Sequence, residues 1–245
     1  MIDFTGKVAL VTGAGLGIGQ SCAVALAHHG ADVAINYFTS AEGAQATQER
    51  VRALGRRALV VQADVSKDDQ VQAMVKTVES VQSGLGSIDI LINNAGWSRM
   101  QELEEIDETA WDEVIAANLK SVFLVTRAVL PGMRERGWGR IVNVSSGAAQ
   151  MGGSRGIHYT AAKGGVDALT RAYASRLVKE GVTVNAVAPA LIETGDKRDN
   201  EARRKMVPIG RQGTPEEVAD AVVLCAGTEF MTGQSVHMNG GMYYR

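Results

Sequence analysis

The chain has 245 residues, 45% of them hydrophobic, and a net charge of −2, so it can bury a substantial core. Its basic residues form no stripe or tail, and no apolar run reaches the roughly 18 residues of a membrane span, so we expect neither a nucleic-acid nor a membrane partner. The N-terminus shows no signal-peptide pattern, and Cys22 and Cys225 lie far apart in apolar helical patterns, typical of reduced thiols in a cytoplasmic protein.

The first predicted element is an apolar strand over residues 7–12, followed at once by a glycine-rich turn and a helix from Gln20 to His29. Glycines at 13, 17 and 19 would let the backbone approach a pyrophosphate. The helix N-terminus would offer free N–H groups and a positive dipole to the phosphates. In this strand–turn–helix context, the sequence predicts a dinucleotide site.

The second predicted strand, residues 32–37, ends where a dinucleotide fold meets the adenosine ribose. An acidic residue there would bind the 2′-hydroxyl and repel a 2′-phosphate. The chain has no carboxylate there before Glu42, so NADP is favoured over NAD, although no Arg or Lys is present to hold the phosphate. Thr39 and Ser40 could donate to that phosphate, or cap the helix predicted over 41–54.

A third strand over 58–62 ends at Asp64-Val65, and Ser66 is predicted to cap a helix over about 67–82. Asp64 could accept a hydrogen bond from an adenine amino group or cap its own loop. The fourth strand, 88–92, ends in a run of small residues, 93–96, that would let a cofactor ribose lie against the backbone. In the next loop, Trp97 and Met100 could line a substrate pocket or pack at the surface.

A helix containing Trp111 is predicted to lead into a second helical run that ends near Arg136 and includes Asn118. An Asn inside an apolar helix is usually a satisfied polar group. It could also bend the helix and hold a water molecule.

The fifth strand, 141–144, ends in Ser145-Ser146, and a glycine-rich loop separates it from a helix that carries Tyr159 and Lys163. Residues i and i+4 share one helix face, so a hydroxyl, a phenol and an amine could meet in one cleft. A phenol, with a reference pKa of about 10, is a poor acid at neutral pH, but a nearby ammonium stabilises its phenolate. Such a phenol can exchange a proton with a substrate oxygen.

The sixth strand, 183–188, is stopped by Pro189. The polar segment 190–208 fits a substrate lid better than a plain surface helix. Thr214-Pro215-Glu216-Glu217 is a helix-start signal, and a last strand spans 233–238. This order predicts an α/β fold: one doubly wound Rossmann domain over 1–245, with a seven-stranded, mostly parallel sheet and helices on both faces.

The ordered motifs resemble those of the short-chain dehydrogenase/reductase family from end to end, and most closely its 3-oxoacyl-(acyl-carrier-protein) reductase-like branch. The branch is suggested by the GTPEEVA segment at 213–219 and the HMNGG tail. The family motifs are TGAGLGIG at 12–19, Asp64-Val65, NNAG at 93–96, Asn118, Ser146, YTAAK at 159–163, NAVAP at 185–189 and the ending GQSVHMNGG.

The resemblance implies a role for each residue of a catalytic tetrad. Ser146, chosen over Ser145 by its interval to Tyr159, would hydrogen-bond the substrate carbonyl. Tyr159 would be the general acid in reduction and the base in oxidation. Lys163 would stabilise the phenolate and bind the nicotinamide ribose, and Asn118 would hold a water that relays protons to Lys163.

The resemblance also implies a nicotinamide cofactor, no metal, and a homotetramer formed through helices at about 111–135 and 159–180 with the C-terminal edge. Ile192 and Thr194 match the segment that contacts the carboxamide. The residues expected to contact the cofactor are Gly13, Gly15, Leu16, Gly17, Ile18, Gly19, Tyr37, Thr39, Ser40, Asp64, Val65, Asn94, Ala95, Gly96, Tyr159, Lys163, Pro189, Ile192 and Thr194.

Several departures from the branch leave the substrate open. Ala190 replaces a glycine after Pro189, and the lid from Thr194 to Pro208 is several residues shorter than usual. Where carrier-dependent reductases have basic docking residues, this chain has Gly137 and Glu180, although Arg136 and Lys179 are adjacent. His158, beside Tyr159, could face the pocket or solvent.

The sequence therefore predicts an NADP-preferring carbonyl reductase, with 3-oxoacyl thioesters as one substrate class among several. A small ketone remains open as the substrate, and so does an NAD-dependent alcohol or sugar dehydrogenase. A non-catalytic dinucleotide sensor or scaffold is the remote alternative, disfavoured because all four tetrad residues are present.

Overall fold

The computed structural model describes residues 2–82, 84–153, 155–195 and 200–244. Seven strands form one sheet in the order β3-β2-β1-β4-β5-β6-β7, and every pairing between neighbours is parallel. Because the strand order reverses between β1 and β4, a ligand-binding crevice is expected at the carboxyl ends of these two strands. The strands are β1 (Val8–Val11), β2 (Asp32–Tyr37), β3 (Ala58–Gln62), β4 (Ile90–Asn93), β5 (Gly139–Val144), β6 (Val182–Pro189) and β7 (Ser235–Met238).

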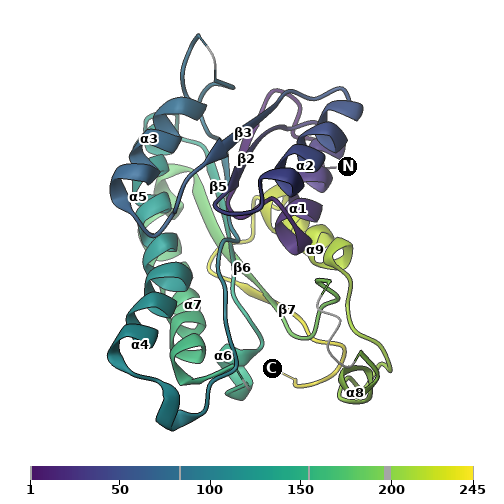
Figure 1. Ribbon diagram of the computed structural model, residues 1–245. Helices are drawn as coiled ribbons and strands as arrows, with labels where there is room; N and C mark the ends of the chain where they lie inside the picture. Colours follow the sequence, from purple (N-terminus) through teal and green to yellow (C-terminus); the bar gives the residue numbers. More distant parts are fainter. Residues whose placement is uncertain (1, 83, 154, 196–199, 245) are drawn as a thin grey trace.

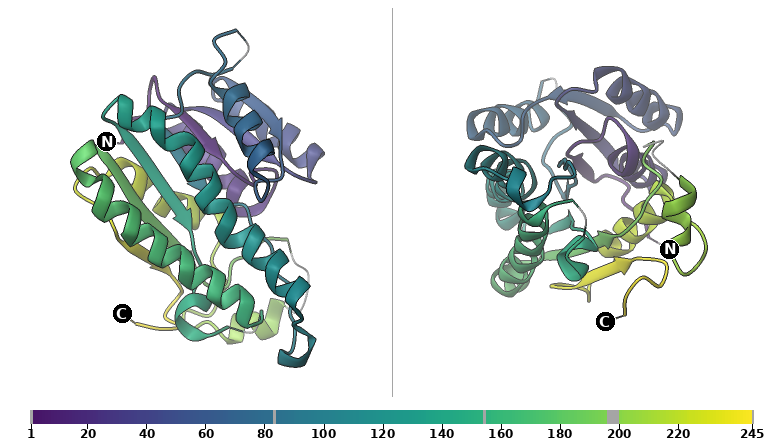
Figure 2. Two further views of the ribbon diagram at one scale, coloured as in Figure 1. Left: turned by 90° about the vertical axis from the view of Figure 1, so that its left-hand side faces the viewer. Right: turned by 60° about the horizontal axis from the view of Figure 1, so that its bottom comes forward.

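Helices cover both faces of the sheet (Figure 1). One face carries α1 (Gly17–His28), α2 (Ala41–Ala53) and α9 (Pro215–Gly227). The other carries α3 (Asp68–Val78), α4 (Glu108–Ile115), α5 (Ser121–Glu135) and α7 (Ile157–Leu177), and α7 runs beside the α4–α5 helical run (Figure 2). The doubly wound α/β architecture predicted from the sequence is therefore confirmed. The short elements are η1 (Leu103–Glu105), α6 (Ala148–Met151), η3 (Val178–Glu180) and α8 (Asn200–Lys205).

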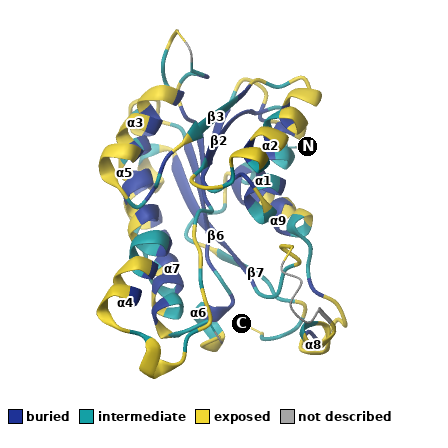
Figure 3. Cartoon of the chain, viewed as in Figure 1, coloured by how far each residue is buried: buried dark blue, intermediate teal, exposed yellow. Residues whose placement is uncertain are grey.

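The core consists of two apolar layers, one on each face of the sheet (Figure 3). The central strands β1, β4, β5 and β6 are buried along their whole length, as parallel strands covered on both faces must be. Cys22 and Cys225 are free thiols in one of these layers. Burial raises the pKa of Cys22 to about 12 and that of Cys225 to about 11, so both remain protonated at neutral pH.

The predicted start of the last helix is confirmed in detail. The Thr214 hydroxyl accepts from the Glu217 N–H at 3.2 Å, and the Glu217 carboxylate accepts from the Thr214 N–H at 2.8 Å. This capping box, with Pro215 in the first turn, satisfies backbone donors that a helix start leaves unpaired. Hydrogen bonding to Arg211 and to the Thr214 backbone lowers the pKa of Glu217 to about 2.

Several predicted boundaries differ from those in the structure. Helix α1 begins at Gly17 rather than Gln20, so the last two glycines of the turn lie in its first turn. Helix α3 has Lys67, not Ser66, at its N-cap, because the Asp64 carboxylate accepts from the Ser66 N–H at 2.9 Å and holds Ser66 in the preceding turn. It ends at Val78 rather than near 82, and β7 begins at Ser235 rather than at residue 233.

The run from α4 to α5 is continuous but widens into a π-helical turn, η2 (Ala116–Lys120), centred on Asn118. Within this run, Glu108–Glu135, an 18-residue window has a mean hydropathy of 1.4, so by length and composition the run could cross a membrane. Its inner face, however, supplies Val114, Val122 and Val125 to the core, and core helices meet the same criterion. This run is not continuously apolar, since Asn118, Lys120 and Arg127 interrupt it.

The predicted lid, 190–208, is described only in part, because residues 196–199 lie outside the described residues. Its first part leaves the end of β6, where the Ala190 N–H donates to the Met238 carbonyl at 3.0 Å. Ile192 then pairs with Gly213 in a short parallel bridge. Helix α8 follows the undescribed residues.

Candidate active site

The glycine-rich turn lies at the carboxyl end of β1, between β4 and the start of α1. A Cβ atom at Gly13 would lie 2.9 Å from the Cα of Ala95, and one at Gly19 would lie 2.3 Å from the Gly13 carbonyl oxygen. Only glycine fits these two positions without movement of the backbone. The N–H groups of Gly17, Ile18 and Gly19 have no backbone acceptor among the described residues. Unpaired N–H groups at a helix start are suited to binding an anion.

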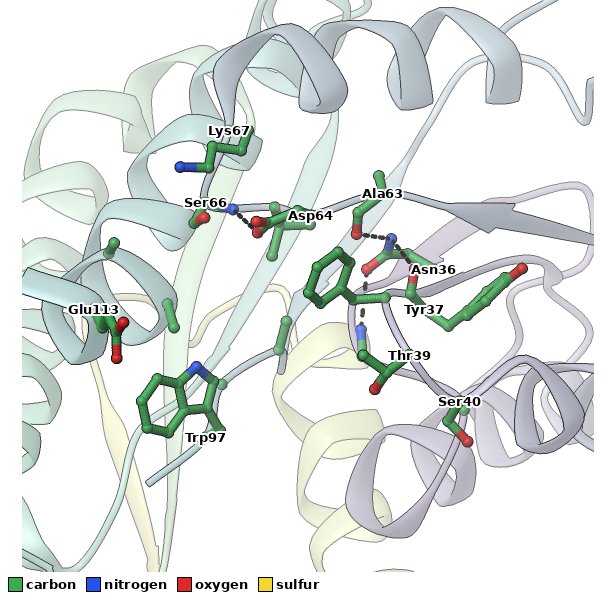
Figure 4. Close-up of a pocket in the computed structure, with 18 of the residues that line it drawn as sticks. Asn36, Tyr37, Thr39, Ser40, Ala63, Asp64, Ser66, Lys67, Trp97 and Glu113 are labelled. Atoms are coloured by element: carbon green, nitrogen blue, oxygen red, sulfur yellow. Dashed lines mark hydrogen bonds between the residues drawn. The ribbon is translucent and has the colours of Figure 1, made fainter. Parts of the chain in front are cut away.

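A cavity of about 670 Å³ opens beside this turn, at the ends of β2 and β3 (Figure 4). Asn36, which the sequence did not single out, connects two segments of the cavity wall. Its side chain accepts from the Gly13 N–H at 3.2 Å and donates to the Ala63 carbonyl at 3.1 Å. The predicted cofactor residues that line this cavity are Gly13, Gly15, Leu16, Tyr37, Thr39, Ser40, Asp64, Val65, Ala95 and Gly96.

The polar groups of this cavity do not by themselves distinguish NADP from NAD. Ser40 occupies the N-cap position of α2, but its side chain accepts no hydrogen bond from the helix, so the predicted capping role is wrong. For Asp64, the structure fits both roles considered, capping its own loop and accepting from an adenine amino group. One carboxylate oxygen accepts from the Ser66 N–H in the loop, and the residue also lines the cavity. Among the described lining residues, Lys67 is the one cation, and it is outnumbered by Asp64, Asp112 and Glu113.

A second cavity, of about 500 Å³, shares Gly13, Leu16 and residues 95–97 with the first and extends to the ends of β5 and β6. It brings together all four residues of the predicted tetrad. It also holds the remaining predicted cofactor residues. These lining residues are Gly17, Ile18, Gly19, Asn94, Asn118, Ser146, Tyr159, Lys163, Pro189, Ile192 and Thr194.

The two serines at the end of β5 have different surroundings. The Ser145 hydroxyl is buried and donates to the Lys163 carbonyl at 3.2 Å, which ties the strand to α7. The Ser146 hydroxyl accepts from the Ala148 N–H at 3.2 Å and is partly exposed in the cavity, where it retains its own proton to donate. Ser146 is therefore the serine free to donate to a ligand.

Tyr159 and Lys163 lie one turn apart on α7, with the Lys163 Nζ 5.8 Å from the centre of the Tyr159 ring. Lys163 is buried and donates to the Val144 carbonyl at 2.8 Å. An ammonium carries three donors, so two remain. The lysine is thus fixed beside the phenol with donors to spare for a ligand.

Asn118 reaches the same cavity from the π-helical turn. Its amide nitrogen donates to the Trp97 carbonyl at 2.8 Å and the Val114 carbonyl at 3.0 Å. Its side-chain oxygen is buried with no hydrogen-bond partner within the described part of the chain. A Cβ at Gly96 would lie 2.4 Å from that oxygen and 3.7 Å from the Lys163 Nζ. The unsatisfied acceptor therefore lies close to the lysine, where a water could join the two.

Some residues near the second cavity lie elsewhere than the sequence suggested. Trp97 lines both cavities, whereas Met100 lines neither. His158 faces neither the pocket nor solvent: it is fully buried, and its Nε2 lies 3.0 Å from the Gln101 Oε1. Arg155 and Ser98 also line the second cavity, although the sequence singled out neither of them individually.

These features fit a nicotinamide dinucleotide. The cavities meet at a glycine cradle with free helix N–H groups, and the inner one ends at a phenol, an amine and a hydroxyl. The characteristic pattern of the family described as short chain dehydrogenase matches residues 7–205. The chain belongs to the short-chain dehydrogenase family. It is an NAD(P)-dependent oxidoreductase that acts on CH–OH groups.

Relatives of this short-chain dehydrogenase include two named 3-oxoacyl-(acyl-carrier-protein) reductase. That of Staphylococcus aureus is 41% identical over 97% of this chain and 98% of its own. That of Pseudomonas aeruginosa is 42% identical over 99% of both. A protein named nodulation protein G, from Azospirillum brasilense, is also 42% identical, over 98% of this chain and 99% of its own.

Two solved structures superpose on this short-chain dehydrogenase with a TM-score of 0.91. One, from Sinorhizobium meliloti, is provisionally named a short-chain alcohol dehydrogenase and is 33% identical. The other, from Agrobacterium tumefaciens, is provisionally named a gluconate dehydrogenase and is 30% identical. Each match covers 98% of this chain and 97% of the other.

Proposed function

We propose that this protein is an NADP-preferring carbonyl reductase that takes 3-oxoacyl thioesters or small ketones. The observation that carries the proposal is that one cavity of about 500 Å³ contains both the glycine turn and Ser146, Tyr159 and Lys163. A cofactor on the turn and a carbonyl beside the phenol would therefore share one space. The relatives named as 3-oxoacyl-(acyl-carrier-protein) reductases support the thioester class.

The bound cofactor would supply the hydride, and the chain's own residues would handle the carbonyl oxygen. The Ser146 hydroxyl donates a hydrogen bond to that oxygen and fixes its position. Tyr159 gives its proton to the oxygen as negative charge develops there. The Lys163 ammonium stabilises the resulting phenolate, and a water on the Asn118 side-chain oxygen returns a proton towards Lys163. In the oxidative direction each proton moves the opposite way.

The cofactor-contact residues predicted from the sequence stand as part of this proposal. NADP is preferred because Thr39 and Ser40, and no carboxylate, follow directly after β2, where the adenosine ribose is expected. An NAD-dependent alcohol or sugar dehydrogenase is the second candidate. It is favoured by the three acidic residues of that cavity and by the relative named as a gluconate dehydrogenase.

The cofactor preference can be measured as kcat/KM with NADPH and with NADH. We expect NADPH to be favoured by about tenfold, because neutral hydroxyl donors hold a phosphate only modestly. Leu16→Arg should widen the ratio by about tenfold more by adding a charged donor, and Thr39→Asp should reverse it by repelling the 2′-phosphate. Tighter binding of NADH to the wild-type protein, or no change with Thr39→Asp, would contradict the NADP assignment.

Docking of an acyl carrier protein is weakly supported by the surface charges. Glu180 forms an ion pair with Arg134, and the Arg136 guanidinium donates to the Ile88 carbonyl at 2.7 Å. Both arginines are therefore already engaged, which reduces electrostatic steering of an acidic partner. A free small substrate is accordingly included in the proposal beside a carrier-bound one.

The remaining parts of the proposal concern the domain, the cellular location and the oligomeric state of the protein. We propose residues 1–245 as one dinucleotide-binding domain with a lid at 190–208, in a cytoplasmic homotetramer. The tetramer would use the α4–α5 run and α7, which lie side by side on one face of the sheet (Figure 2). Closed symmetric assemblies are the usual form of such oligomers. Light scattering that gives the mass of a monomer would rule the tetramer out.

A further inference from the structure

The inner cavity carries more positive charge than the proposed chemistry uses. Arg155, Lys163 and Arg203 line it, and its described lining residues include no Asp or Glu. Lys163 belongs to the proposed catalytic group, and Arg203 reaches the cavity from α8. Arg155 stands in the loop between α6 and α7, four residues before Tyr159, and has no part in the mechanism above.

Arg155 is half-buried and is held by a neutral partner. Its Nη1 donates to the Ser98 hydroxyl at 2.8 Å. Within residues 2–82, 84–153, 155–195 and 200–244, no carboxylate forms an ion pair with it. Arg134 and Arg211, by contrast, form ion pairs with Glu180 and Glu217. Among the described residues, no carboxylate therefore balances the charge that Arg155 presents to the cavity.

A guanidinium has five N–H donors in a planar fork that matches a carboxylate or a phosphate. One donor of Arg155 is used by Ser98, which orients the fork without neutralising it. Partial removal from water makes an ion pair with a ligand stronger than one on an open surface. These are the properties of a built anion site, and it opens into the same cavity as Tyr159 and Ser146.

We propose that Arg155, oriented by Ser98, binds a compact anionic group on the substrate, close to the reacting carbonyl. The substrate is then a short oxo acid or a phosphorylated ketone, reduced to the corresponding hydroxy compound. This inference rests on the proposed function and narrows its substrate class. A 3-oxoacyl thioester carries no charge beside its carbonyl and therefore gains no binding energy from Arg155.

The test compares substrates with the same ketone and different charge. Acetoacetate is paired with its neutral N-acetylcysteamine thioester, and dihydroxyacetone phosphate with dihydroxyacetone, each assayed with NADPH and with NADH. In the wild-type enzyme we expect the charged member of at least one pair to have the lower KM. Arg155→Gln should raise that KM by about 10- to 100-fold, the usual effect of losing a charged hydrogen bond, and leave the neutral member unchanged. The pair that responds distinguishes a carboxylate from a phosphate.

Ser98→Ala is the matched control, because it removes the partner of Arg155 and keeps the guanidinium. It should retain most of the preference for the charged substrate. If Arg155→Gln impaired charged and neutral substrates equally, Arg155 would only join two loops and the anion site would be refuted. A wild-type preference for the neutral member of both pairs would also refute it, while leaving the proposed carbonyl reductase intact.

A binding measurement separates failure of this inference from failure of the proposed function. Quenching of tryptophan fluorescence by acetoacetate and by dihydroxyacetone phosphate, in protein saturated with NADP⁺, reports binding without turnover. Binding that is lost in Arg155→Gln would support the anion site even if no carbonyl were reduced. Binding of neither anion to the wild-type protein would overturn the inference.

Discussion

Replacing Tyr159 with phenylalanine is expected to lower kcat for carbonyl reduction by about 10²- to 10⁴-fold, the usual contribution of a positioned general acid. The change removes one oxygen and its proton from the cavity and leaves the ring in place. Because Lys163 is anchored to the Val144 carbonyl at 2.8 Å, its position does not depend on the phenol. The dissociation constant of the cofactor should therefore change little. Stopped-flow and steady-state assays at 340 nm measure both quantities.

Tyr173→Phe is the matched control for this prediction. Tyr173 lies on the same helix, α7, packs against the core, and lines neither cavity. Burial raises the pKa of its phenol, so it remains protonated and has no acid–base role. We expect kcat to be unchanged. If Tyr159→Phe also left kcat unchanged, Tyr159 would not be the proton donor.

Adding a single methyl group at Gly19 should weaken cofactor binding by about tenfold or more. In Gly19→Ala the new carbon would lie 2.3 Å from the Gly13 carbonyl oxygen and 2.4 Å from the Asn94 Nδ2. Neither neighbour can move easily, since Asn94 donates to the Thr12 and Gly13 carbonyls at 2.9 and 3.1 Å. Overpacking of this kind costs about 1–3 kcal/mol and would open the cradle formed by the turn.

Gly164→Ala is the control for added bulk, since a Cβ there meets nothing within 4 Å. On α7 it should stabilise the fold by about 0.5–1 kcal/mol and leave cofactor affinity unaltered. Calorimetric titration gives the affinities, and thermal melting without cofactor shows whether Gly19→Ala remains folded. A folded Gly19→Ala protein with wild-type affinity would show that the cradle does not hold the pyrophosphate.

The parts of the fold and site that follow from local spacing were predictable. The β-branched run ending at Val144 became a fully buried strand, and the i, i+4 relation of Tyr159 and Lys163 put both on the cavity side of α7. The capping pattern from Thr214 to Glu217 was also complete in the sequence. In each case the information lies within a few consecutive residues.

Features decided by contacts between distant segments were not predictable in the same way. His158 contacts Gln101, and Arg155 contacts Ser98, across 57 residues of sequence in both cases. A histidine beside the candidate catalytic tyrosine gives no sign in the sequence that its side chain turns inward to the loop after β4. The start of α1 at Gly17 was missed because glycine disfavours helix, whereas Gly19 lies so close to Gly13 and Asn94 that only glycine fits in this first turn.

The π-helical turn at Asn118 was predictable only in part. An amide in an apolar helix suggested a local bend, and the structure has a widened turn at that position. The sequence could not show that the side-chain oxygen has no hydrogen-bond partner among the described residues, or that it approaches Lys163 where Gly96 has no side chain. Such widened turns occur frequently at functional sites.

In the proposed reaction, hydride moves between NADP(H) and a carbonyl in the cavity of Tyr159. The most direct test mixes the protein with NADPH that carries deuterium at both C4 positions and a panel of oxo acids, small ketones and 3-oxoacyl thioesters, and analyses the products by mass spectrometry. We predict an alcohol that carries deuterium on the former carbonyl carbon, formed by the wild-type protein and lost in Tyr159→Phe. Tight binding of the cofactor with no deuterium transferred to any member of the panel would contradict the account and indicate a non-catalytic dinucleotide sensor.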